Sequence, residues 1–215
     1  MTPFEHPFIH PTAIIENGVE IGEHSSVWDN VHVRRNTRIG KHCIIGEKTH
    51  ISYDVRIGDL VKINAFVYIC TAVTIENGVM ISAGSIFTND RYPRAADPDL
   101  LHLNSSAPDE TTLPTLVRQG ATIGAGCVIG CGLTIGRFAM VGMGSVVTRS
   151  IPDFHLVVGN PARSIGYVCR CGERLGHAAS AEPKSSTHIC SRCSRSYEIN
   201  GDAVTEVFSS ELTAT

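Results

Sequence analysis

The chain has 215 residues, of which 20 are glycine, and only 6% are aromatic although 42% are hydrophobic, so the large rings that usually fill a core are scarce. A net charge of −3 with 18% charged residues offers no basic surface for nucleic acid and no charge excess of the kind that keeps chains disordered. No apolar run approaches the roughly 20 residues of a membrane-spanning helix and the first residues lack a signal-peptide layout, so we expect a cytoplasmic protein whose eight cysteines are core residues or metal ligands rather than disulfides.

Every sixth residue is aliphatic or phenylalanine in two runs, residues 9–88 and 117–152. The fifth position of each unit is small or β-branched in nearly all units. One large and one small inward residue in every six do not fit a helix, but they suit a very short strand followed by a turn. The 20 slots of the series are Ile9, Ile15, Ile21, Val27, Val33, Ile39, Ile45, Ile51, Ile57, Ile63, Ile69, Ile75, Ile81, Phe87, Val117, Ile123, Ile129, Ile135, Val141 and Val147.

Glycine recurs at the second and fourth positions of the units, and the other fourth positions often hold His, Asn or Asp, which tolerate a positive φ better than most residues. Three units with three turns make a triangular coil, and stacked coils form a parallel β-helix with a ladder of inward isoleucines. The sequence therefore predicts a mainly β protein with between six and seven coils.

The series is interrupted between its two runs. Pro93, Asp99, Ser105 and Thr111 occupy the slots there, so we expect a loop over residues 88–116. Loops of this length are uncommon in compact folds and are usually functional when they occur. A solvated excursion that covers one edge of a coil is the alternative.

A second module follows the repeats. Cys169 and Cys171 form one closely spaced pair, and Cys190 and Cys193 form another 19 residues further on. Four thiolates in two turns can hold a tetrahedral structural Zn²⁺, and the segment has too few apolar residues to fold without a metal. We therefore predict a small zinc-ribbon-like module over 165–200, with disulfides or unligated thiols as alternatives, and a frayed tail over 201–215.

The repeats, together with the segments IFTNDRYPRA, TLVRQGATIGAGCVIGCGLTIG and VVGNPARSIGYV, resemble the hexapeptide-repeat acyltransferases. The likeness is greatest to the enzymes that use acetyl-CoA to acetylate the 3-amino group of nucleotide-linked amino sugars for bacterial surface polysaccharide. It covers residues 9–168 and implies a left-handed β-helix domain over 1–164 that assembles as a homotrimer. The cysteine module departs from the simplest members of that family, which end soon after the GxPAR motif.

The same resemblance implies that Asn89 lies near the acceptor amine. A sugar amine of depressed pKa is already nucleophilic at neutral pH, so positioning and oxyanion donors can suffice for its acetylation. His102 in the loop is the competing catalytic residue, since a histidine base is what attack by a hydroxyl group requires. Substrate binding is expected from the remaining loop residues Arg91, Tyr92 and Arg94.

Two histidines of the repeats, His32 and His50, occupy the outward sixth position one coil apart and should stack on one face. They are candidates for contact with the nucleotide sugar, with a surface or interface pair and a metal site as alternatives. For acetyl-CoA, the resemblance implies a groove along the later coils between two subunits. The expected backbone contacts and guanidinium partners of its phosphates are Ala125, Gly142, Gly144, Arg118, Arg137 and Arg163.

The resulting hypothesis is an acetyl-CoA-dependent N-acetyltransferase that acts on a nucleotide-linked amino sugar, with no nucleic-acid or membrane partner. Three alternatives stay open. They are an O-acetyltransferase with a histidine base, a metal-binding β-helix similar to the γ-type carbonic anhydrases, and a non-catalytic scaffold, because one fold can serve several functions. The absence of a third histidine soon after His50 counts against the carbonic anhydrase.

Overall fold

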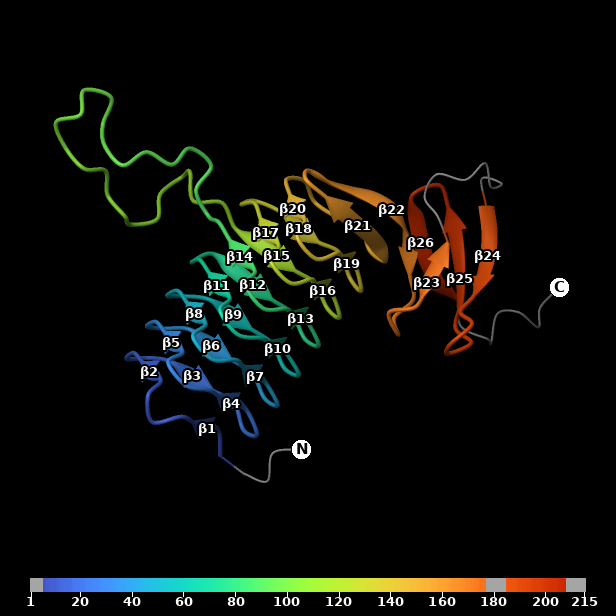
Figure 1. The fold of residues 1–215 in the computed structure, drawn as a ribbon, viewed down its shortest axis with the longest axis horizontal. Coiled ribbons are helices and arrows are strands. Elements are labelled where there is room, and N and C mark those ends of the chain that lie inside the picture. The colour runs from blue at the N-terminus through green and yellow to red at the C-terminus, as the bar shows by residue number, and fades with distance from the viewer. Residues whose placement is uncertain (1–5, 177–184, 208–215) are drawn as a thin grey trace.

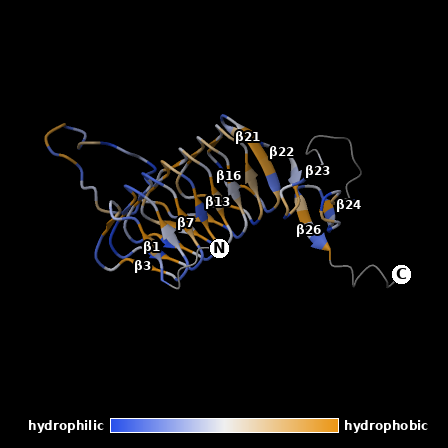
Figure 2. Cartoon of the chain, turned by 60° about the horizontal axis from the view of Figure 1, so that its bottom comes forward, coloured by the Kyte–Doolittle hydropathy of each residue, from blue (hydrophilic) through white to orange (hydrophobic). Residues whose placement is uncertain are grey.

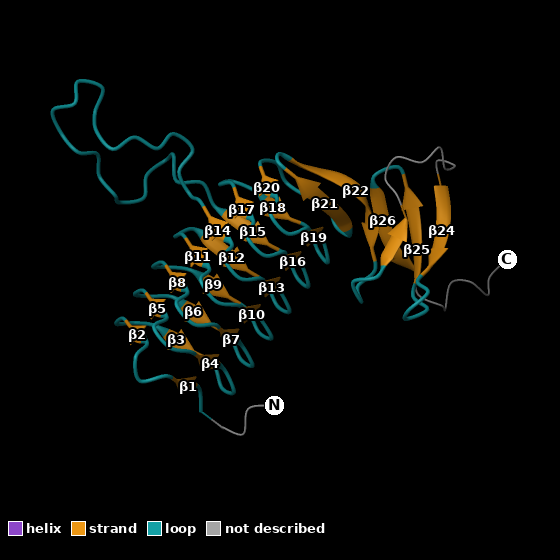
Figure 3. Ribbon diagram, viewed as in Figure 1, coloured by secondary structure: helices purple, strands orange, loops and turns teal. Residues whose placement is uncertain are grey.

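A computed structural model describes residues 6–176 and 185–207. Over these residues the chain forms a long parallel β-helix, a loop that projects from its side and a C-terminal antiparallel module (Figures 1 and 3). All the regular elements within these ranges are strands. None of the described residues forms a helix long and apolar enough to cross a membrane.

Three parallel sheets form the sides of the β-helix, and the first 20 strands are two or three residues long. Sheet A contains β1 (Phe8–Ile9), β4 (Ser26–Val27), β7 (Ile44–Ile45), β10 (Lys62–Ile63), β13 (Met80–Ile81), β16 (Thr122–Ile123), β19 (Met140–Val141) and β21 (His155–Gly159). Sheet B contains β2 (Ile14–Ile15), β5 (His32–Val33), β8 (His50–Ile51), β11 (Tyr68–Ile69), β14 (Ile86–Phe87), β17 (Val128–Ile129) and β20 (Val146–Val147). Sheet C contains β3 (Glu20–Ile21), β6 (Arg38–Ile39), β9 (Arg56–Ile57), β12 (Val73–Ile75), β15 (Thr115–Val117) and β18 (Thr134–Ile135).

The predicted slots are the last residues of these strands, and each lies directly above its equivalent in the preceding coil. Ile63, for example, pairs with Ile45 on one side and Ile81 on the other, and all three are fully buried. Figure 2 shows hydrophobic residues recurring along successive coils. The parallel β-helix expected from the repeat is confirmed, and it agrees with the left hand that the family resemblance implies.

Three corners connect the sheets, and each is named here for the two sheets it joins. Corner AB includes residues 124–127, corner BC includes 52–55 and corner CA includes 118–121. Successive turns stack so closely that a Cβ added to Gly22 would lie 2.6 Å from the carbonyl carbon of Gly40. Glycine at the second position therefore permits close stacking of the backbone.

The β-helix continues beyond the last predicted slot. Ile151 forms a parallel bridge with Ile135, and Val157 in β21 pairs with Val141. Both pairings join positions that are closer in the sequence than the equivalent positions of earlier coils, so the sixth-residue series ends although the coil does not. The expectation of six to seven coils is therefore too low, and the β-helix has about eight turns.

The loop leaves corner BC after β14 and returns to β15, so it comprises residues 88–114. Thr115 and Leu116, which we expected in the loop, belong to β15. Two antiparallel bridges give the loop its shape, Asp90 with Thr112 at its base and Ala96 with Leu103 further out. Figure 1 shows it extending away from the coils.

The C-terminal part begins as an extension of sheet A. β22 (Ala162–Val168) pairs antiparallel with β21, and β23 (Arg174–Gly176) pairs with β22. A separate sheet follows with β24 (Ser185–Ile189), β25 (Ser196–Asn200) and β26 (Ala203–Val207) in that order.

Two expected boundaries in this region are wrong. The boundary between residues 164 and 165 falls inside β22, and residues 203–207 form β26 rather than a tail. The rest of the expected tail, residues 208–215, lies outside the described residues.

Candidate functional site

A cavity of about 550 Å³ lies between corner BC and the base of the loop. Its floor comes from successive coils of the β-helix and its far wall from the loop. The lining residues are Arg34, Ser52, Tyr53, Tyr68, Cys70, Thr71, Asn89, Asp90, Pro93, Arg94, Ala95, Leu103, Asn104, Ser105 and Ser106. Most of these side chains are polar, so the cavity suits a hydrophilic ligand.

Asn89 lies at the junction of β-helix and loop and is half-buried. Its backbone carbonyl accepts a hydrogen bond from the Leu113 N–H at 2.9 Å, and the next carboxylate, on Asp90, accepts one from the Thr112 hydroxyl at 3.4 Å. These contacts connect the outgoing and returning strands of the loop. The backbone of Asn89 is therefore held by the base of the loop. This arrangement leaves the side-chain amide of Asn89 available to a ligand.

Cys70 is the one thiol among the residues that line this cavity. It donates a hydrogen bond to the Phe87 carbonyl at 3.0 Å, and burial, together with the charge of Asp90, raises its pKa to about 11. The thiol is therefore protonated at neutral pH. A protonated thiol is a poor nucleophile, so the cavity is not built for a covalent acyl-cysteine intermediate.

The predicted loop residues are not all at this cavity. Arg94 lines it and also lines, with Tyr92, an adjoining hollow of about 320 Å³ that lies within the loop. The Arg91 guanidinium lies 5.5 Å from the Tyr92 ring centroid and lines neither space. The structure therefore brings Asn89, Tyr92 and Arg94 together.

His102 lies apart from these spaces. Its Nδ1 is 3.0 Å from an Asp97 carboxylate oxygen, and its side chain is 82% exposed. The carboxylate of Asp97 also accepts the Leu101 N–H at 2.9 Å, and this bond, followed by the one with His102, lowers its pKa. The pair orders the outer part of the loop and gives no base at the cavity.

His32 and His50 lie side by side on the outer side of sheet B, as the spacing predicts, because they are paired across adjacent strands. Their rings meet edge to face with centroids 5.1 Å apart, whereas His50 stacks on the Tyr68 ring at 4.8 Å. Burial, followed by the neighbouring charges of His32 and Arg34, lowers the pKa of His50. His50 therefore favours its neutral form. Tyr68 connects this row to the cavity.

The six residues expected to bind acetyl-CoA fall on two different edges of sheet A. Ala125, Gly142 and Gly144 lie in successive turns of corner AB, where the Gly144 N–H donates to the Ala125 carbonyl at 2.8 Å. Arg163 joins this group because it pairs with Val158, whose side chain lies against Gly142.

Arg118 and Arg137 lie at corner CA, across sheet A from those turns. The Arg118 guanidinium is 3.5 Å from the Asp153 carboxylate, and the same carboxylate accepts the backbone N–H of Arg137 at 2.7 Å. Both residues therefore take part in capping the turns of this corner. The structure does not bring them together with the glycine turns.

Several residues that line the cavity escaped the sequence reasoning, namely Arg34, Ser52, Tyr53 and Thr71. Arg34, Ser52 and Cys70 occupy equivalent positions of three successive coils and lead to Thr88, where the loop begins. Equivalent positions stack on one another, so these residues form a row beneath the loop. In the sequence, this row appears at the second position of three repeat units, where a residue other than glycine follows the inward slot.

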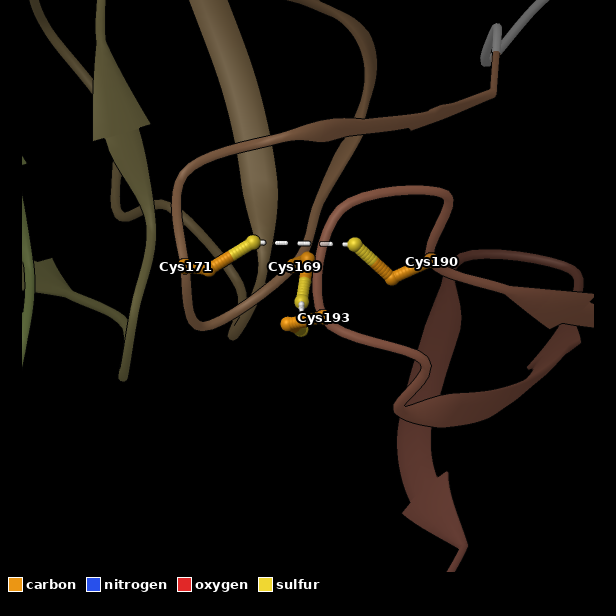
Figure 4. Close-up of side chains that lie close together, drawn as sticks. All are labelled: Cys169, Cys171, Cys190 and Cys193. Atoms are coloured by element: carbon orange, nitrogen blue, oxygen red, sulfur yellow. Dashed lines mark hydrogen bonds between the residues drawn. The ribbon is translucent and has the colours of Figure 1, made fainter.

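The four predicted metal ligands lie together (Figure 4). Cys169 and Cys171 occupy the turn between β22 and β23, whereas Cys190 and Cys193 occupy the turn between β24 and β25. All four Sγ atoms are within 4.8 Å of one another. The pairs Cys169–Cys193 and Cys171–Cys190 are separated by 3.3 and 3.6 Å. Sulfurs bound at ~2.3 Å around a tetrahedral zinc are roughly 3.8 Å apart, so the cluster has the dimensions of such a site.

Polar groups around the cluster favour thiolates. The backbone N–H of Arg195 is the main cause that lowers the pKa of Cys193. The buried Tyr197 hydroxyl lies 3.1 Å from Cys169 Sγ and accepts the Arg170 N–H at 3.1 Å, and it can donate its own proton when the sulfur is a thiolate. Burial raises the pKa of Cys169, and a dication would offset this cost of holding charge.

The module is attached to the β-helix by aromatic and hydrogen-bond contacts. Phe154 stacks on Phe138 at 5.6 Å between centroids and meets the Tyr197 ring at 5.5 Å. The buried His155 lies 2.9 Å from both the Ser164 hydroxyl and the Asp202 carbonyl. The module that contains the cysteine cluster thus packs against the last coil of the β-helix.

Comparison with known families agrees with this architecture. The model for bacterial transferase hexapeptide (six repeats) matches residues 20–53 and 36–71, and the model for the hexapeptide repeat of succinyl-transferase matches residues 114–149. These matches identify hexapeptide repeats over residues 20–71 and 114–149. The matched segments lie on the coils before and after the loop.

This hexapeptide-repeat protein is 56% identical over 61 residues to the dTDP-3-amino-3,6-dideoxy-alpha-D-galactopyranose 3-N-acetyltransferase of Aneurinibacillus thermoaerophilus. The match covers 28% of this chain and 32% of that enzyme, so it spans about a third of the relative's length.

Among solved structures, a variant of AntD, an N-acyltransferase from Bacillus cereus in complex with dTDP and coenzyme A, superimposes with a TM-score of 0.52 at 20% identity. The superposition covers 79% of this chain and 87% of AntD and supports the shared fold. PerB from Caulobacter crescentus, in complex with CoA and GDP-perosamine, has a TM-score of 0.42 at 24% identity, and the match covers 76% of this chain and 58% of PerB.

Proposed function

We propose that this protein is an acetyl-CoA-dependent N-acetyltransferase that acetylates the amine of a nucleotide-linked amino sugar for surface polysaccharide. The observation that carries the proposal is the 56% identity over 61 residues to an enzyme with that activity. The polar cavity at Asn89 supports it, because a sugar linked to a nucleotide needs a hydrophilic site of this kind.

In the proposed reaction the amine attacks the thioester carbonyl of acetyl-CoA directly. A C–N bond forms, the C–S bond breaks, the CoA thiolate departs and the new amide nitrogen loses a proton to solvent or to the departing sulfur. The Asn89 side-chain amide would orient the amine, and backbone N–H groups would receive the developing oxyanion. The high pKa of Cys70 is consistent with direct transfer.

The alternative of O-acetylation is less well supported by the position of His102. A hydroxyl acceptor needs a base within hydrogen-bond reach, whereas His102 lines neither the cavity nor the adjoining hollow and is paired with Asp97. We therefore assign His102 to loop structure. Arg91, Tyr92 and Arg94 stay as proposed substrate contacts from the loop.

For acetyl-CoA we propose the turns of corner AB. Ala125, Gly142 and Gly144 would offer backbone groups to the extended arm of the cofactor, and Arg163 is near enough to the same turns to meet a phosphate. Arg118 and Arg137 are poorer candidates for the same molecule because they lie at corner CA and share Asp153.

We further propose a homotrimer that uses the outer side of sheet B, called here face B. Its row runs through Ile14, His32, His50, Tyr68 and Ile86, which are neighbours across adjacent strands. The three apolar or aromatic members are between 43% and 57% exposed, and such a row is typical of a protein interface. His32 and His50 would then line the seam between subunits, next to the substrate cavity.

The four clustered cysteines would hold a structural Zn²⁺ with all four positions filled by sulfur. A reducing cytoplasm would keep these thiols available for the metal. A catalytic zinc of the carbonic anhydrase type gains no support, since the cysteine cluster is the sole group of three or more candidate ligands among the described residues.

The proposal is tested by acetyl transfer from labelled acetyl-CoA to a panel of dTDP-, UDP- and GDP-linked amino sugars with the amine at position 3 or 4. We expect one of them to become labelled, with one CoA thiol released for each acetyl group. Labelling of none of the panel, or CoA release that depends on a hydroxyl acceptor instead, would contradict it.

A further inference from the structure

Arg34 lies at the opposite end of the cavity from Asn89. The two residues belong to coils that are three steps apart at corner BC, and both line the same space. Adjacent parallel strands are separated by about 4.8 Å, so three steps place the backbones of the two residues roughly 14 Å apart, and their side chains extend into the space between them. An elongated polar molecule can lie along this row.

The Arg34 side chain is held from two sides. Its Nε donates to Glu16 Oε1 at 3.2 Å, and its guanidinium carbon lies 5.6 Å from the centroid of the Tyr53 ring. The Glu16 carboxylate also contacts His32 Nε2 at 2.9 Å and accepts the Arg35 backbone N–H at 2.9 Å. Hydrogen bonds from the Arg35 amide, then His32 and Arg34, lower the pKa of Glu16, so the partner of Arg34 stays ionised.

The bond to Glu16 uses the Nε edge of the guanidinium, and the contact with Tyr53 uses one of its faces. Within the described residues, no acceptor lies within hydrogen-bond distance of its two terminal nitrogens. Two parallel N–H donors on a planar, permanently charged group match two phosphate oxygens. The side chain is 36% exposed, which leaves it accessible to a ligand.

Charges in the cavity are arranged from one end to the other. Arg34 is the cation of the early coils, whereas Asp90 and Asn89 are at the loop base together with Arg94, whose guanidinium donates to the Pro93 carbonyl at 3.0 Å. A nucleotide-linked amino sugar has the same polarity, with an anionic diphosphate at one end of the sugar and an amine that is partly cationic at the other. Opposite orientation would place the diphosphate against the Asp90 carboxylate and is disfavoured.

We infer that Arg34 is the anchor for the diphosphate of the substrate, so that the amine points to Asn89 and the nucleoside extends toward Glu16 and Tyr53. This assignment rests on the proposed function for the class of substrate. Its competitor is a purely structural role in which Arg34 only forms an ion pair with Glu16 between adjacent coils.

Arg35 provides a matched control. It is the adjacent residue, carries the same charge, and lies 4.7 Å from the same Tyr53 ring, yet it does not line the cavity. Its hydrogen bond to Glu16 comes from the backbone, so substitution of its side chain leaves that contact in place.

The test is calorimetric titration of the full chain and of the variants Arg34→Gln, Arg34→Lys and Arg35→Gln. The probes are dTDP, UDP and GDP together with thymidine, uridine and guanosine. For the diphosphate that the unaltered protein prefers, Arg34→Gln should weaken binding on the order of 10- to 100-fold, and Arg34→Lys should weaken it less. In Arg35→Gln, the Kd for the same diphosphate should change by less than roughly twofold. The Kd for the matching nucleoside should change as little in every variant.

Unchanged diphosphate affinity in Arg34→Gln, an equal loss for nucleoside and diphosphate, or an equal effect in Arg35→Gln would overturn the assignment. So would absence of diphosphate binding to the unaltered protein. Circular dichroism shows whether Arg34→Gln is folded, and if it is not, the comparison of Arg34→Lys with Arg35→Lys decides by the same criteria.

The outcomes also separate this inference from the proposed function. The expected binding pattern without acetyl transfer would leave the anchor in place and refute the acetyltransferase. If Arg34→Gln transfers acetyl groups with the same KM for the nucleotide sugar as the unaltered protein, the acetyltransferase proposal would stand and the role of Arg34 as anchor would be refuted.

Discussion

At the corners of the β-helix, the residue at the fourth position of most units has a φ near +60°. Glycine, asparagine, aspartate or histidine occupies many of these positions, as the repeat predicts, but Lys48, Leu60, Phe66 and Ala72 adopt the same conformation with φ between 57° and 64°. A left-handed conformation costs such residues about 1–2 kcal/mol. The stacked coils above and below impose it, because each corner must repeat the turn beneath it.

Leu60 allows this cost to be measured, because it has a φ of 59° and a side chain that is 64% exposed. We expect Leu60→Gly to raise the free energy of unfolding by about 0.5 kcal/mol, since relief of the conformational cost exceeds the added entropy of the unfolded chain. Leu60→Val should lower it because a β-branched residue fits a positive φ poorly. Thermal unfolding of the two variants checks the sign, and a lower midpoint for Gly than for Val would refute the explanation.

Substitutions of Asn89 and His102 distinguish direct acetylation of an amine, which Asn89 would position, from acetylation of a hydroxyl group with a histidine base. Asn89→Ala should lower kcat on the order of 100-fold by removing a positioning group, while its backbone bond to Leu113 keeps the loop base intact. His102→Ala should change kcat less than roughly twofold because its imidazole faces solvent. Steady-state rates of acetyl transfer decide, and the reverse order would favour a histidine base.

Among the elements, the loop and the cysteine module are the two parts that interrupt or end the repeat, and each brings distant residues together. The loop places Asn89 and Arg94 over side chains of earlier coils. The module places two turns, from the hairpins β22–β23 and β24–β25, so that four sulfurs meet. The apolar cluster of Phe154, Cys169, Cys190 and Tyr197 is too small to stabilise the module alone, so the proposed zinc would have a structural role.

Removal of the metal should therefore unfold the module and spare the coils. In the double variant Cys190→Ser with Cys193→Ser, we expect zinc content to fall from about one per chain to near zero. Hydrogen exchange should then lose protection in β24–β26 and keep it in β4–β14. Cys131→Ser, which alters a cysteine outside the cluster, should retain zinc. Full protection of β24–β26 in the metal-free variant would show that the module does not need the ion.

At the scale of the whole molecule, the outer side of sheet B carries a continuous row of apolar and aromatic groups, whereas Ser26, Lys62 and Thr122 interrupt the corresponding row on sheet A. Face B carries this row, whereas the outer side of sheet C carries charged residues such as Glu20, Arg38 and Arg56. The outward residues of a parallel sheet are exposed to water unless another surface covers them. Because the apolar row lies on face B, we predict that another subunit covers this side. Assembly through face B would also place the substrate cavities near the seams between subunits.

Light scattering tests this assembly. With a chain of 23.1 kDa, we expect a species of about 69 kDa for a trimer. Tyr68→Asp on face B should reduce the mass toward that of the monomer by burying a charge in the interface. Arg56→Glu on sheet C should leave it unchanged. A monomer for the unaltered chain, or equal effects of the two substitutions, would contradict the role of face B.

Much of the fold and part of the site could be predicted from residue spacing. The inward slots, the row of His32 and His50 and the two cysteine pairs follow from local patterns. In the structure the slots are inward, the histidines are neighbours and the four cysteines lie together. The last coil escaped prediction because its pairings, Ile135 with Ile151 and Val141 with Val157, fall short of the regular repeat. The row from Arg34 to Cys70 was missed because residue types at surface turns carry little signal by themselves.

The sequence by itself determined that the chain stacks into coils, because a strict period of six leaves no other way to bury its isoleucines and valines. Only the tertiary structure decided the phase across the loop. The interval from Phe87 to Val117 equals five repeat units, which would bring Val117 to sheet A, yet the two residues lie on neighbouring sheets B and C. The physical reason is that the loop leaves and returns at one corner, so its residues do not advance the coil. That phase placed Arg118 and Arg137 at one edge of sheet A and Ala125, Gly142 and Gly144 at the other.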